Sequence, residues 1–266
     1  MIYTYDTFIE ISIKMNKSIT KIDETSINIL NNIKKQLNIH VQEVLKVTII
    51  NKKESISQIF KILNKMTDKN YDKLKIELFD IIKHIETIEE INKITELIFK
   101  IASSNIFYSN LFSKLYCELI QIKQEFFNVF QERFDVHITN MHKLNYVDPN
   151  IDYDEYCLYI KRVEILKSSL TFFINLMKKN VCSLDNIVEI GIKLQESIIE
   201  NKSTIEQNEE YINNIGIIIK ECIEYLLFHD KMNVFYNNIL NIQGMNISKK
   251  INFKCLDMLD IIKNNN

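Results

Sequence analysis

The sequence predicts an all-α fold of stacked helical hairpins, and three observations point to it. The 266-residue chain contains only three glycines and one proline, so it lacks the turn residues on which β-hairpins and phosphate-binding loops depend. Hydrophobic residues make up 46% of the chain, which is enough for a continuous core. Amphipathic segments recur in pairs at a spacing of roughly forty residues, which is typical of solenoids built from helical repeats.

The N-terminal part of the chain is expected to differ from the rest. Residues 1–22 form a polar and aromatic arm, and residues 23–50 carry apolar residues at helical spacing from Ile27 to Leu45, which predicts one helix. Residues 51–266 are expected to form the solenoid. Its amphipathic segments, which we expect to pair into hairpins, cover residues 53–66, 68–84, 88–103, 108–131, 154–179, 184–200, 206–228, 230–242 and 248–262.

The breaks between these segments contain residues that can cap the start of a helix or that favour an exposed loop. Thr87 and Glu90 have capping-box spacing, in which each side chain can satisfy exposed backbone donors of the other. Ser183 and Ser248 stand at equivalent places before later segments. Residues 145–153, NYVDPNIDY, hold the only proline and several acids. We expect this stretch to be an exposed connector between the second and third hairpins.

Charge and cysteine usage constrain the partners and the compartment. The formal net charge of -2 gives no global attraction for nucleic acid or for an anionic membrane. The five cysteines stand far apart with no C-x-x-C pair, which favours reduced, intracellular core residues. No signal peptide opens the chain, and its apolar runs are too short to span a bilayer. We therefore expect a cytoplasmic protein.

No catalytic or cofactor-binding set emerges from the sequence. The three glycines are isolated, so no phosphate-cradling loop is present, and no Ser, Cys or His stands in a nucleophile motif. His137 and His142, near Asp135, fall on different faces of a helix, and a solvated or capping role is favoured over metal binding. We expect a protein that is not an enzyme and that uses no metal or cofactor.

The most specific motif is ILNKMTDKNYDKL, residues 62–74. Leu63 and Met66 help to close one apolar helical face, and Thr67 supplies a hydroxyl that can cap the next helix, which carries Tyr71. The string resembles the first repeat of the middle domain of eukaryotic translation initiation factor 4 gamma, where the family pattern is close to I-L-N-K-L-T-P-x-x-F-x-x-L.

Further blocks resemble the same domain in the same order. Ser168 and Ser169 replace the family's Gly and Asn in the third-repeat pattern, and Asn105 and Ile106 replace a Glu-Pro pair. The resemblance covers residues 51–263 and implies a right-handed solenoid of about five HEAT-like antiparallel hairpins. The matching blocks lie in residues 97–117, 168–178 and 248–260.

Proteins of this family hold a DEAD-box RNA helicase by touching its two lobes at opposite ends of the solenoid. Holding both lobes raises the effective concentration of one beside the other, so helicase activity can rise without chemistry by the scaffold. For Ile59, Phe60 and Phe253 the alternative is an ordinary place in the core, whereas Ile56 and the lysines are better candidates for a surface. The helicase-binding residues that the resemblance implies are Ile56, Ile59, Phe60 and Lys61 in the first hairpin and Lys250, Asn252 and Phe253 in the last helix.

The N-terminal arm resembles the family's site for the cap-binding subunit, which has a tyrosine, four further residues, a leucine and another apolar residue. Tyr3, Phe8 and Ile9 have that spacing, and Tyr5 offers a second alignment one residue shorter. Such a segment can become helical on binding and present an aromatic anchor. The alternative is an arm that simply packs on the first repeat.

Lysine pairs are the best candidates for contact with RNA. Phosphate contacts from lysines give salt-sensitive affinity that does not depend on sequence. The alternative is a solvated charged face, which such runs usually are. The candidate RNA-binding residues are Lys178, Lys179, Lys249, Lys250 and Lys254.

These features favour a compact translation initiation scaffold, which is either a minimal viral or protist version or a part of a longer factor. It would join a DEAD-box helicase to the cap-binding subunit and to mRNA. The alternative is an adaptor of another DEAD-box helicase in RNA processing or decay, without a cap-binding contact. A regulator that acts through RNA binding alone is a third class, and it predicts no effect on a helicase.

Overall fold

The computed structural model describes residues 29, 52–141, 144–201 and 203–265, and it describes the side chains of these residues except 52–54 and 135–141. Contacts divide the chain after residue 50, and the helices below belong to the unit Asn51–Asn266. All regular secondary structure in the described residues is helical, which confirms the all-α class. None of the described helices is long and apolar enough to cross a membrane.

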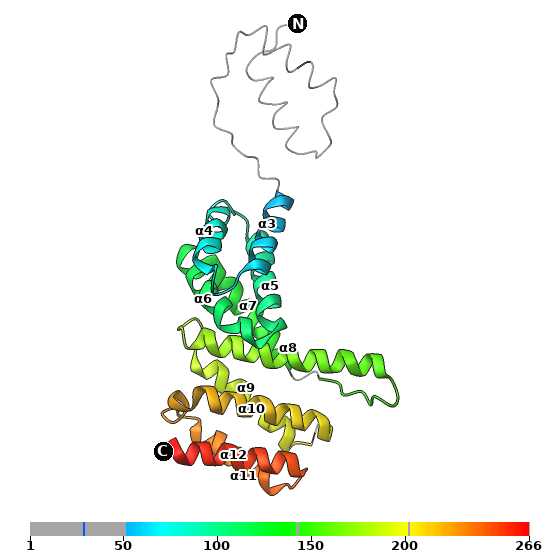
Figure 1. Ribbon diagram of the computed structural model, residues 1–266. Coiled ribbons are helices and arrows are strands. Elements are labelled where there is room, and N and C mark those ends of the chain that lie inside the picture. Colours follow the sequence, from blue (N-terminus) through cyan, green and yellow to red (C-terminus); the bar gives the residue numbers. More distant parts are fainter. Residues whose placement is uncertain (1–28, 30–51, 142–143, 202, 266) are drawn as a thin grey trace. The chain divides into compact units, whose positions relative to one another are not determined.

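The helices of this unit follow one another as five hairpins (Figure 1). Consecutive helices pack together in the first, second, fourth and fifth hairpins. In the third, the rings of Phe134 and Phe173 join the two helices, with centroids 4.8 Å apart. The hairpins are α3 (Lys52–Lys65) with α4 (Tyr71–Ile82), α5 (Ile88–Ser104) with α6 (Ile106–Ile122), α7 (Glu125–Met141) with α8 (Tyr153–Met177), α9 (Leu184–Ile199) with α10 (Ile205–Leu226), and α11 (Met232–Gly244) with α12 (Lys249–Asn265).

Each hairpin buries an apolar face against the next one. Helix α3 packs on α5, and α8 packs on α5 and α6 behind it and on α9 and α10 ahead of it. Helix α9 packs on α11, and α10 on α12. The buried side chains therefore form one continuous core along the unit, from Ile59 to Ile262, as expected of stacked repeats.

Three predicted helix starts are confirmed by their caps. The Thr87 hydroxyl accepts a hydrogen bond from the backbone N–H of Glu90 at 3.3 Å. The Glu90 carboxylate accepts a bond from the Thr87 hydroxyl at 2.6 Å and not the expected one from the Thr87 backbone, so only half of the expected capping box forms. The hydroxyls of Ser183 and Ser248 each accept a bond from the backbone N–H three residues later. These bonds satisfy donors that the first turns of α5, α9 and α12 would otherwise leave without partners.

The motif over residues 62–74 builds the core of the first hairpin. Leu63, Met66 and Tyr71 are buried, and the Tyr71 hydroxyl donates to the Glu118 carboxylate of α6 at 3.1 Å. The expected cap at Thr67 is wrong. Helix α4 begins after residue 70, whose side chain instead accepts a bond from the backbone N–H of Thr67 at 2.7 Å.

The single helix predicted over residues 108–131 is two helices in the structure. Lys123, between α6 and α7, is extended, with φ -140° and ψ 111°. Its ammonium group donates to the carbonyl of Ile85, and the Tyr116 hydroxyl donates to the carbonyl of Phe126 at 2.8 Å. Bonds to other elements stabilise this break, and neither glycine nor proline marks it in the sequence.

The acidic connector also lies at a different place from the expected one. Residues 145–152 separate α7 from α8, so they connect the two helices of the third hairpin and not the second hairpin to the third. The N-cap of α8 is Asp152, whose carboxylate accepts a bond from the backbone N–H of Glu155 at 3.0 Å. The expected exposure of this stretch is confirmed at Ile151, which is 84% exposed.

Candidate partner-binding surfaces

The first expected helicase surface lies on α3, and its residues differ in exposure. Phe60 is 43% exposed and Lys61 is also exposed, whereas Ile56 is half-buried against the core. Ile56 and Phe60 are four residues apart and therefore lie on the same face of the helix. Ile59 is fully buried and belongs to the core. The sequence-based assignment of Ile59 to a contact surface is therefore corrected, because its side chain reaches no solvent.

The second expected surface lies on α12. Phe253 is 66% exposed, and Leu256, three residues later, is 43% exposed on the same face. Asn252 is half-buried, and Lys250 is exposed. The opposite face of α12 is buried through Ile251, Cys255 and Met258. Sequence reasoning missed Leu256, although its spacing from Phe253 is a signal that could have found it.

The two surfaces are built on the first and last hairpins of the described unit. Helix α3 packs on α4 and α5, and α12 packs on α10 and α11. Figure 1 shows α3 and α12 at opposite ends of this unit. The structure therefore does not bring the two expected sets of residues together, and a partner that touches both must span the intervening hairpins.

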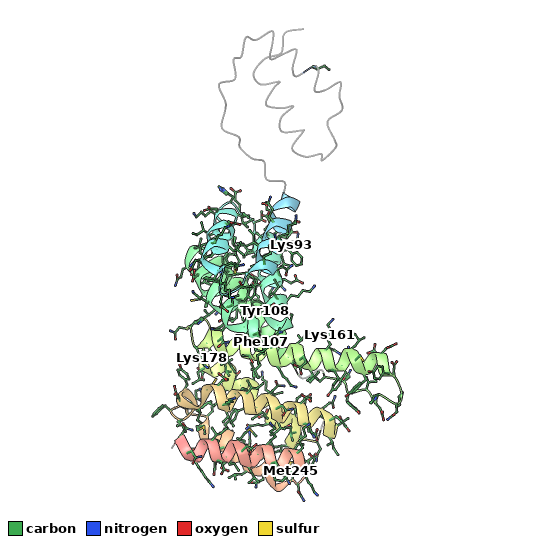
Figure 2. The ribbon with its side chains drawn as sticks, viewed as in Figure 1. Lys93, Phe107, Tyr108, Lys161, Lys178 and Met245 are labelled. Carbon is green, nitrogen blue, oxygen red and sulfur yellow. The ribbon has the colours of Figure 1, made fainter. Side chains whose placement is uncertain are left out.

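The expected RNA-binding lysines form two separate groups. Lys178, at the end of α8 (Figure 2), pairs with Glu221 at 2.9 Å, and Lys250 pairs with Glu209 at 2.7 Å. Both acids belong to α10, and twelve residues of helix separate them by about 18 Å along its axis. Lys179 lies with the first group, and the exposed residues Lys249 and Lys254 lie with the second.

Ion pairing reduces the charge that these lysines offer to an anionic partner. Lys178 and Lys250 each have a carboxylate within ion-pair distance. Lys249 and Lys254 are exposed on α12. Lys249 lies about one turn before Phe253, and Lys254 is the next residue after it. The stronger candidate for phosphate contact is therefore the group on α12.

The remaining expected sites lie outside the described part of the chain. The cap-binding-protein contact of Tyr3, Tyr5, Phe8 and Ile9 falls in residues 1–28, which the structure does not describe. The structure also does not describe the side chain of His137 or any part of residue 142. Among the residues that the structure does describe, no group of His, Cys, Asp and Glu could hold a metal ion.

The buried thiols are not arranged as nucleophiles. Burial raises the pKa of Cys182 and of Cys222 to about 12, and burial raises that of Cys255 to about 11. A thiol with a raised pKa carries little thiolate at neutral pH, and the thiolate is the reactive form. Cys182 lies at the end of the third hairpin and donates to the carbonyl of Phe173 at 3.5 Å.

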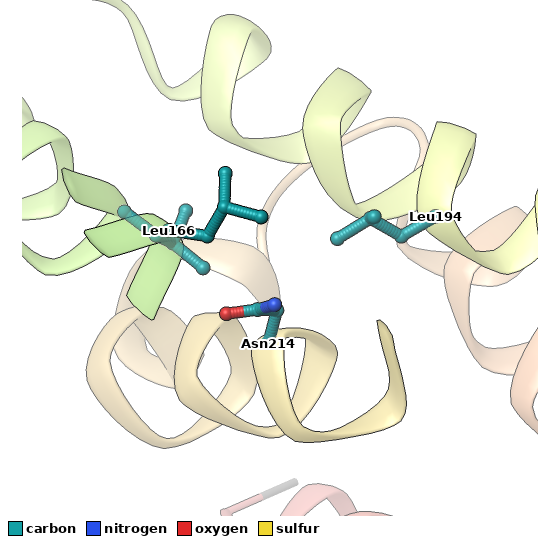
Figure 3. A pocket seen from close by; sticks show the side chains of 4 residues that line it. Leu166, Leu194 and Asn214 are labelled. Carbon is teal, nitrogen blue, oxygen red and sulfur yellow. The ribbon is translucent and has the colours of Figure 1, made fainter. Parts of the chain in front are cut away.

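A small cavity lies between α8, α9 and α10 (Figure 3). Leu166, Leu194 and Asn214 line it, and the Asn214 side chain points into it. Its volume is about 10 Å³, close to the smallest space that holds one water. The Asn214 side-chain oxygen is buried without a protein partner, so a single water is the ligand that fits.

Exposed aromatic residues away from the expected surfaces were not found from the sequence. Phe107 is 84% exposed and Tyr108 is 41% exposed in the first turn of α6 (Figure 2), and Phe228 is 89% exposed between α10 and α11. Scattered apolar residues are normal on protein surfaces. They provide matched controls for substitutions at Phe60 and Phe253.

The fold and the exposed residues define the described unit as a stack of helical hairpins with apolar surfaces on its terminal hairpins. No protein-family model matches the chain, and no curated protein matches it. Among solved structures, the chain resembles the MIF4G domain of the Trypanosoma cruzi translation initiation factor EIF4G5, with a TM-score of 0.48 and 14% sequence identity. The similarity covers 80% of this chain and 96% of that chain.

Proposed function

We propose that this chain is a translation initiation scaffold that binds a DEAD-box RNA helicase and links it to the cap-binding subunit and to mRNA in the cytoplasm. The ordered sequence blocks over residues 51–263 support the family. The exposure of Phe60 and Phe253 on the two terminal hairpins supports the two helicase contacts.

The exposed pair Phe253 and Leu256 is the observation that carries this proposal. Both side chains lie on one face of α12, although the opposite face of that helix supplies core residues. Large apolar side chains that share an exposed face often mark a site of protein contact. Aromatic residues at the centre of such contacts commonly carry much of the binding free energy. Lys254, next to Phe253, adds positive charge beside them.

The scaffold acts by holding both lobes of the helicase. Binding one lobe at α3 and the other at α12 makes the encounter of the lobes intramolecular, which raises their effective concentration. The closed arrangement that binds ATP and RNA is then populated more often. No residue of the scaffold takes part in the chemistry.

Binding of the separate lobes tests this proposal directly. Calorimetric titration of the chain with each isolated lobe of an initiation helicase is expected to show that Phe253→Ala weakens binding of one lobe tenfold or more. Phe60→Ala is expected to weaken only the other lobe. Phe228→Ala removes a ring outside both surfaces that is more exposed than either Phe60 or Phe253, and it is expected to change neither. Equal binding of both lobes by the wild type and Phe253→Ala would overturn the proposal.

The second candidate is an adaptor of another helicase in RNA processing or decay. It shares the two helicase surfaces but has no cap-binding contact, so the arm of residues 1–22 separates the two functions. In the proposed initiation scaffold, replacing Tyr3, Tyr5 and Phe8 together by alanine is expected to abolish binding to the cap-binding subunit. Unchanged binding by the triple variant, or no binding by the wild type, would favour the adaptor.

A further inference from the structure

The first half of α8 presents an apolar face to solvent. Tyr153 is 67% exposed and Ile160 is 40% exposed. Cys157 is exposed between them, and Tyr156 is half-buried. These four residues have i, i+3, i+4 and i+7 spacing, so they share one side of the helix. A stripe of this kind is the usual contact surface where one helix packs on another.

The neighbouring side of α8 is fixed to the rest of the unit. Tyr159 and Val163 are buried there. The Tyr159 ring contacts the ring of Tyr146 in the acidic connector edge-to-face, with centroids 5.4 Å apart, and α8 also packs on α10. In Figure 1 this half of α8 extends beyond α5 and α6. The exposed face therefore belongs to a helix that its own core holds in place.

The surroundings of this face carry negative charge. Residues 144–160 contain four acidic residues and no lysine or arginine. Glu206, in the first turn of α10, adds another carboxylate. Its neighbour Gln207 donates a hydrogen bond to the carbonyl of Leu144, so the start of α10 lies beside the connector. A surface of this charge favours a partner with positive charge.

The three basic residues that follow on α8 offset this charge only in part. Arg162 and Lys167 each lie within ion-pair distance of a carboxylate, at 3.3 and 3.1 Å. Lys161 is exposed (Figure 2). Asp154 and Glu206 are also exposed, and neither forms an ion pair within the described part of the chain. The charges of these two carboxylates are therefore available to a partner.

We propose that this face binds an amphipathic helix of a partner protein, which packs an apolar stripe on Tyr153, Cys157 and Ile160 and places lysine or arginine side chains beside Asp154 and Glu206. All five of these residues are exposed. The apolar contact supplies affinity, and the opposite charges fix the orientation of the bound helix. The site lies on α8 and α10, so it does not depend on the proposed helicase surfaces on α3 and α12.

Synthetic helical peptides supply the probe. The first carries leucine at i, i+3, i+4 and i+7 spacing with lysine on both flanks, the second has glutamate in place of lysine, and the third has the composition of the first in scrambled order. Fluorescence polarisation gives their affinities. The wild type is expected to bind the first peptide at least tenfold more tightly than the others, with an affinity that falls as salt rises. Equal binding of the lysine and glutamate peptides, or no binding of either, would overturn the proposal.

Cys157 reports whether the peptide covers this face. Its thiol is exposed, whereas Cys117 and Cys182 are half-buried and Cys222 and Cys255 are buried. The rate of alkylation by iodoacetamide is measured for each cysteine by mass spectrometry. Saturating lysine peptide is expected to slow the alkylation of Cys157 several-fold and to leave that of Cys117 unchanged. An unchanged rate at Cys157 would place the peptide elsewhere and overturn the proposal.

Two double variants separate the apolar and the charged contacts. Tyr153→Ala with Ile160→Ala is expected to weaken binding of the lysine peptide at least tenfold at both low and high salt. Asp154→Asn with Glu206→Gln is expected to weaken it at low salt and to change little at high salt, where the charges are screened. Phe107→Ala, which removes an 84% exposed ring on α6, is the control for the first pair and is expected to bind as the wild type does.

A carboxylate elsewhere is the control for the charged pair. Glu77 is exposed on α4, and Glu77→Gln is expected to leave the affinity unchanged at every salt concentration. Full binding by Tyr153→Ala with Ile160→Ala, with the circular dichroism of a folded protein, would contradict the proposal. A dimer of this chain in sedimentation velocity that the same double variant abolishes would assign the face to a second copy instead.

Discussion

Adjacent residues on α3 have opposite roles in the structure. Ile59 is fully buried and Phe60 is 43% exposed, although both are large apolar residues in the same amphipathic segment. The reason is the angle of about 100° between consecutive residues of a helix, which turns one side chain into the core and the next to solvent. The sequence alone left both assignments open, because burial depends on helices that lie far away in the chain.

Gly191 is the residue whose small size the packing most clearly requires. A Cβ atom at this position would lie 2.4 Å from Cε2 and 2.8 Å from Cζ of Phe235, and Phe235 is fully buried. Gly191→Ala is therefore expected to lower the free energy of unfolding by about 1–3 kcal/mol through overpacking. Urea denaturation followed by circular dichroism measures the change.

Gly216 provides the matched control for this substitution. It lies within α10, and the nearest neighbour of a new Cβ atom is the Met258 sulfur at 3.9 Å. Gly216→Ala is expected to raise the free energy of unfolding by about 0.5–1 kcal/mol, because alanine loses less backbone entropy in a helix. Destabilisation of similar size by both substitutions would contradict the close approach of α9 and α11.

At the scale of the helix, the start of α10 has the most complete cap. The Thr204 hydroxyl accepts a bond from the backbone N–H of Gln207 at 3.3 Å, and the Gln207 side chain accepts one from the backbone N–H of Thr204 at 2.8 Å. The Gln207 side chain also donates to the carbonyl of Leu144. The cap therefore fixes the start of α10 beside the segment that precedes α8.

Removing this cap is expected to destabilise the protein. Thr204→Ala is expected to lower the free energy of unfolding by about 1 kcal/mol, whereas Thr204→Ser keeps the hydroxyl and is expected to remain close to the wild type. Urea denaturation gives both values, and hydrogen exchange of the first turn of α10 shows where protection is lost. Equal stability of the two variants would mean that the hydroxyl bond contributes nothing.

The sequence predicted helices well where their ends carry local signals. The starts at Thr87, Ser183 and Ser248 were found because a side chain bonds a backbone donor within the same turn. The break at Lys123 was missed because its bonds reach other elements. The small cavity at Asn214 was also missed, since its lining comes from three different helices.

For the molecule as a whole, the charge distribution predicts weak binding to RNA. The net charge is -2, and of the expected lysines only Lys249 and Lys254 are exposed on α12 without an ion pair in the described residues. Fluorescence anisotropy with a single-stranded RNA is expected to show affinity that falls steeply with salt. Lys249→Gln with Lys254→Gln is expected to reduce the salt slope by about 1.4, or about 0.7 for each lost phosphate contact.

A lysine elsewhere serves as the control for RNA binding. Lys93, on α5, is exposed and paired with Glu89 at 2.6 Å, and Lys93→Gln is expected to leave the salt slope unchanged. The same slope in the double variant and the wild type would exclude α12 as the phosphate contact. Absence of RNA affinity even at low ionic strength would exclude the RNA contact altogether.

The central claim is that surfaces at the two ends of the described unit act together on one helicase. Phe60 and Phe253 are exposed, so replacing either one removes one of the two contacts and leaves the core intact. Because the second contact is intramolecular once the first has formed, loss of either one should remove most of the gain from linking the lobes.

The RNA-dependent ATPase rate of an initiation DEAD-box helicase, measured with and without this chain, tests the claim most directly. The wild type and Phe228→Ala are expected to stimulate the rate equally. Phe60→Ala and Phe253→Ala are each expected to lose most of the stimulation, and the double variant is expected to lose little more than either one. No stimulation by the wild type, or full stimulation by the double variant, would contradict the account.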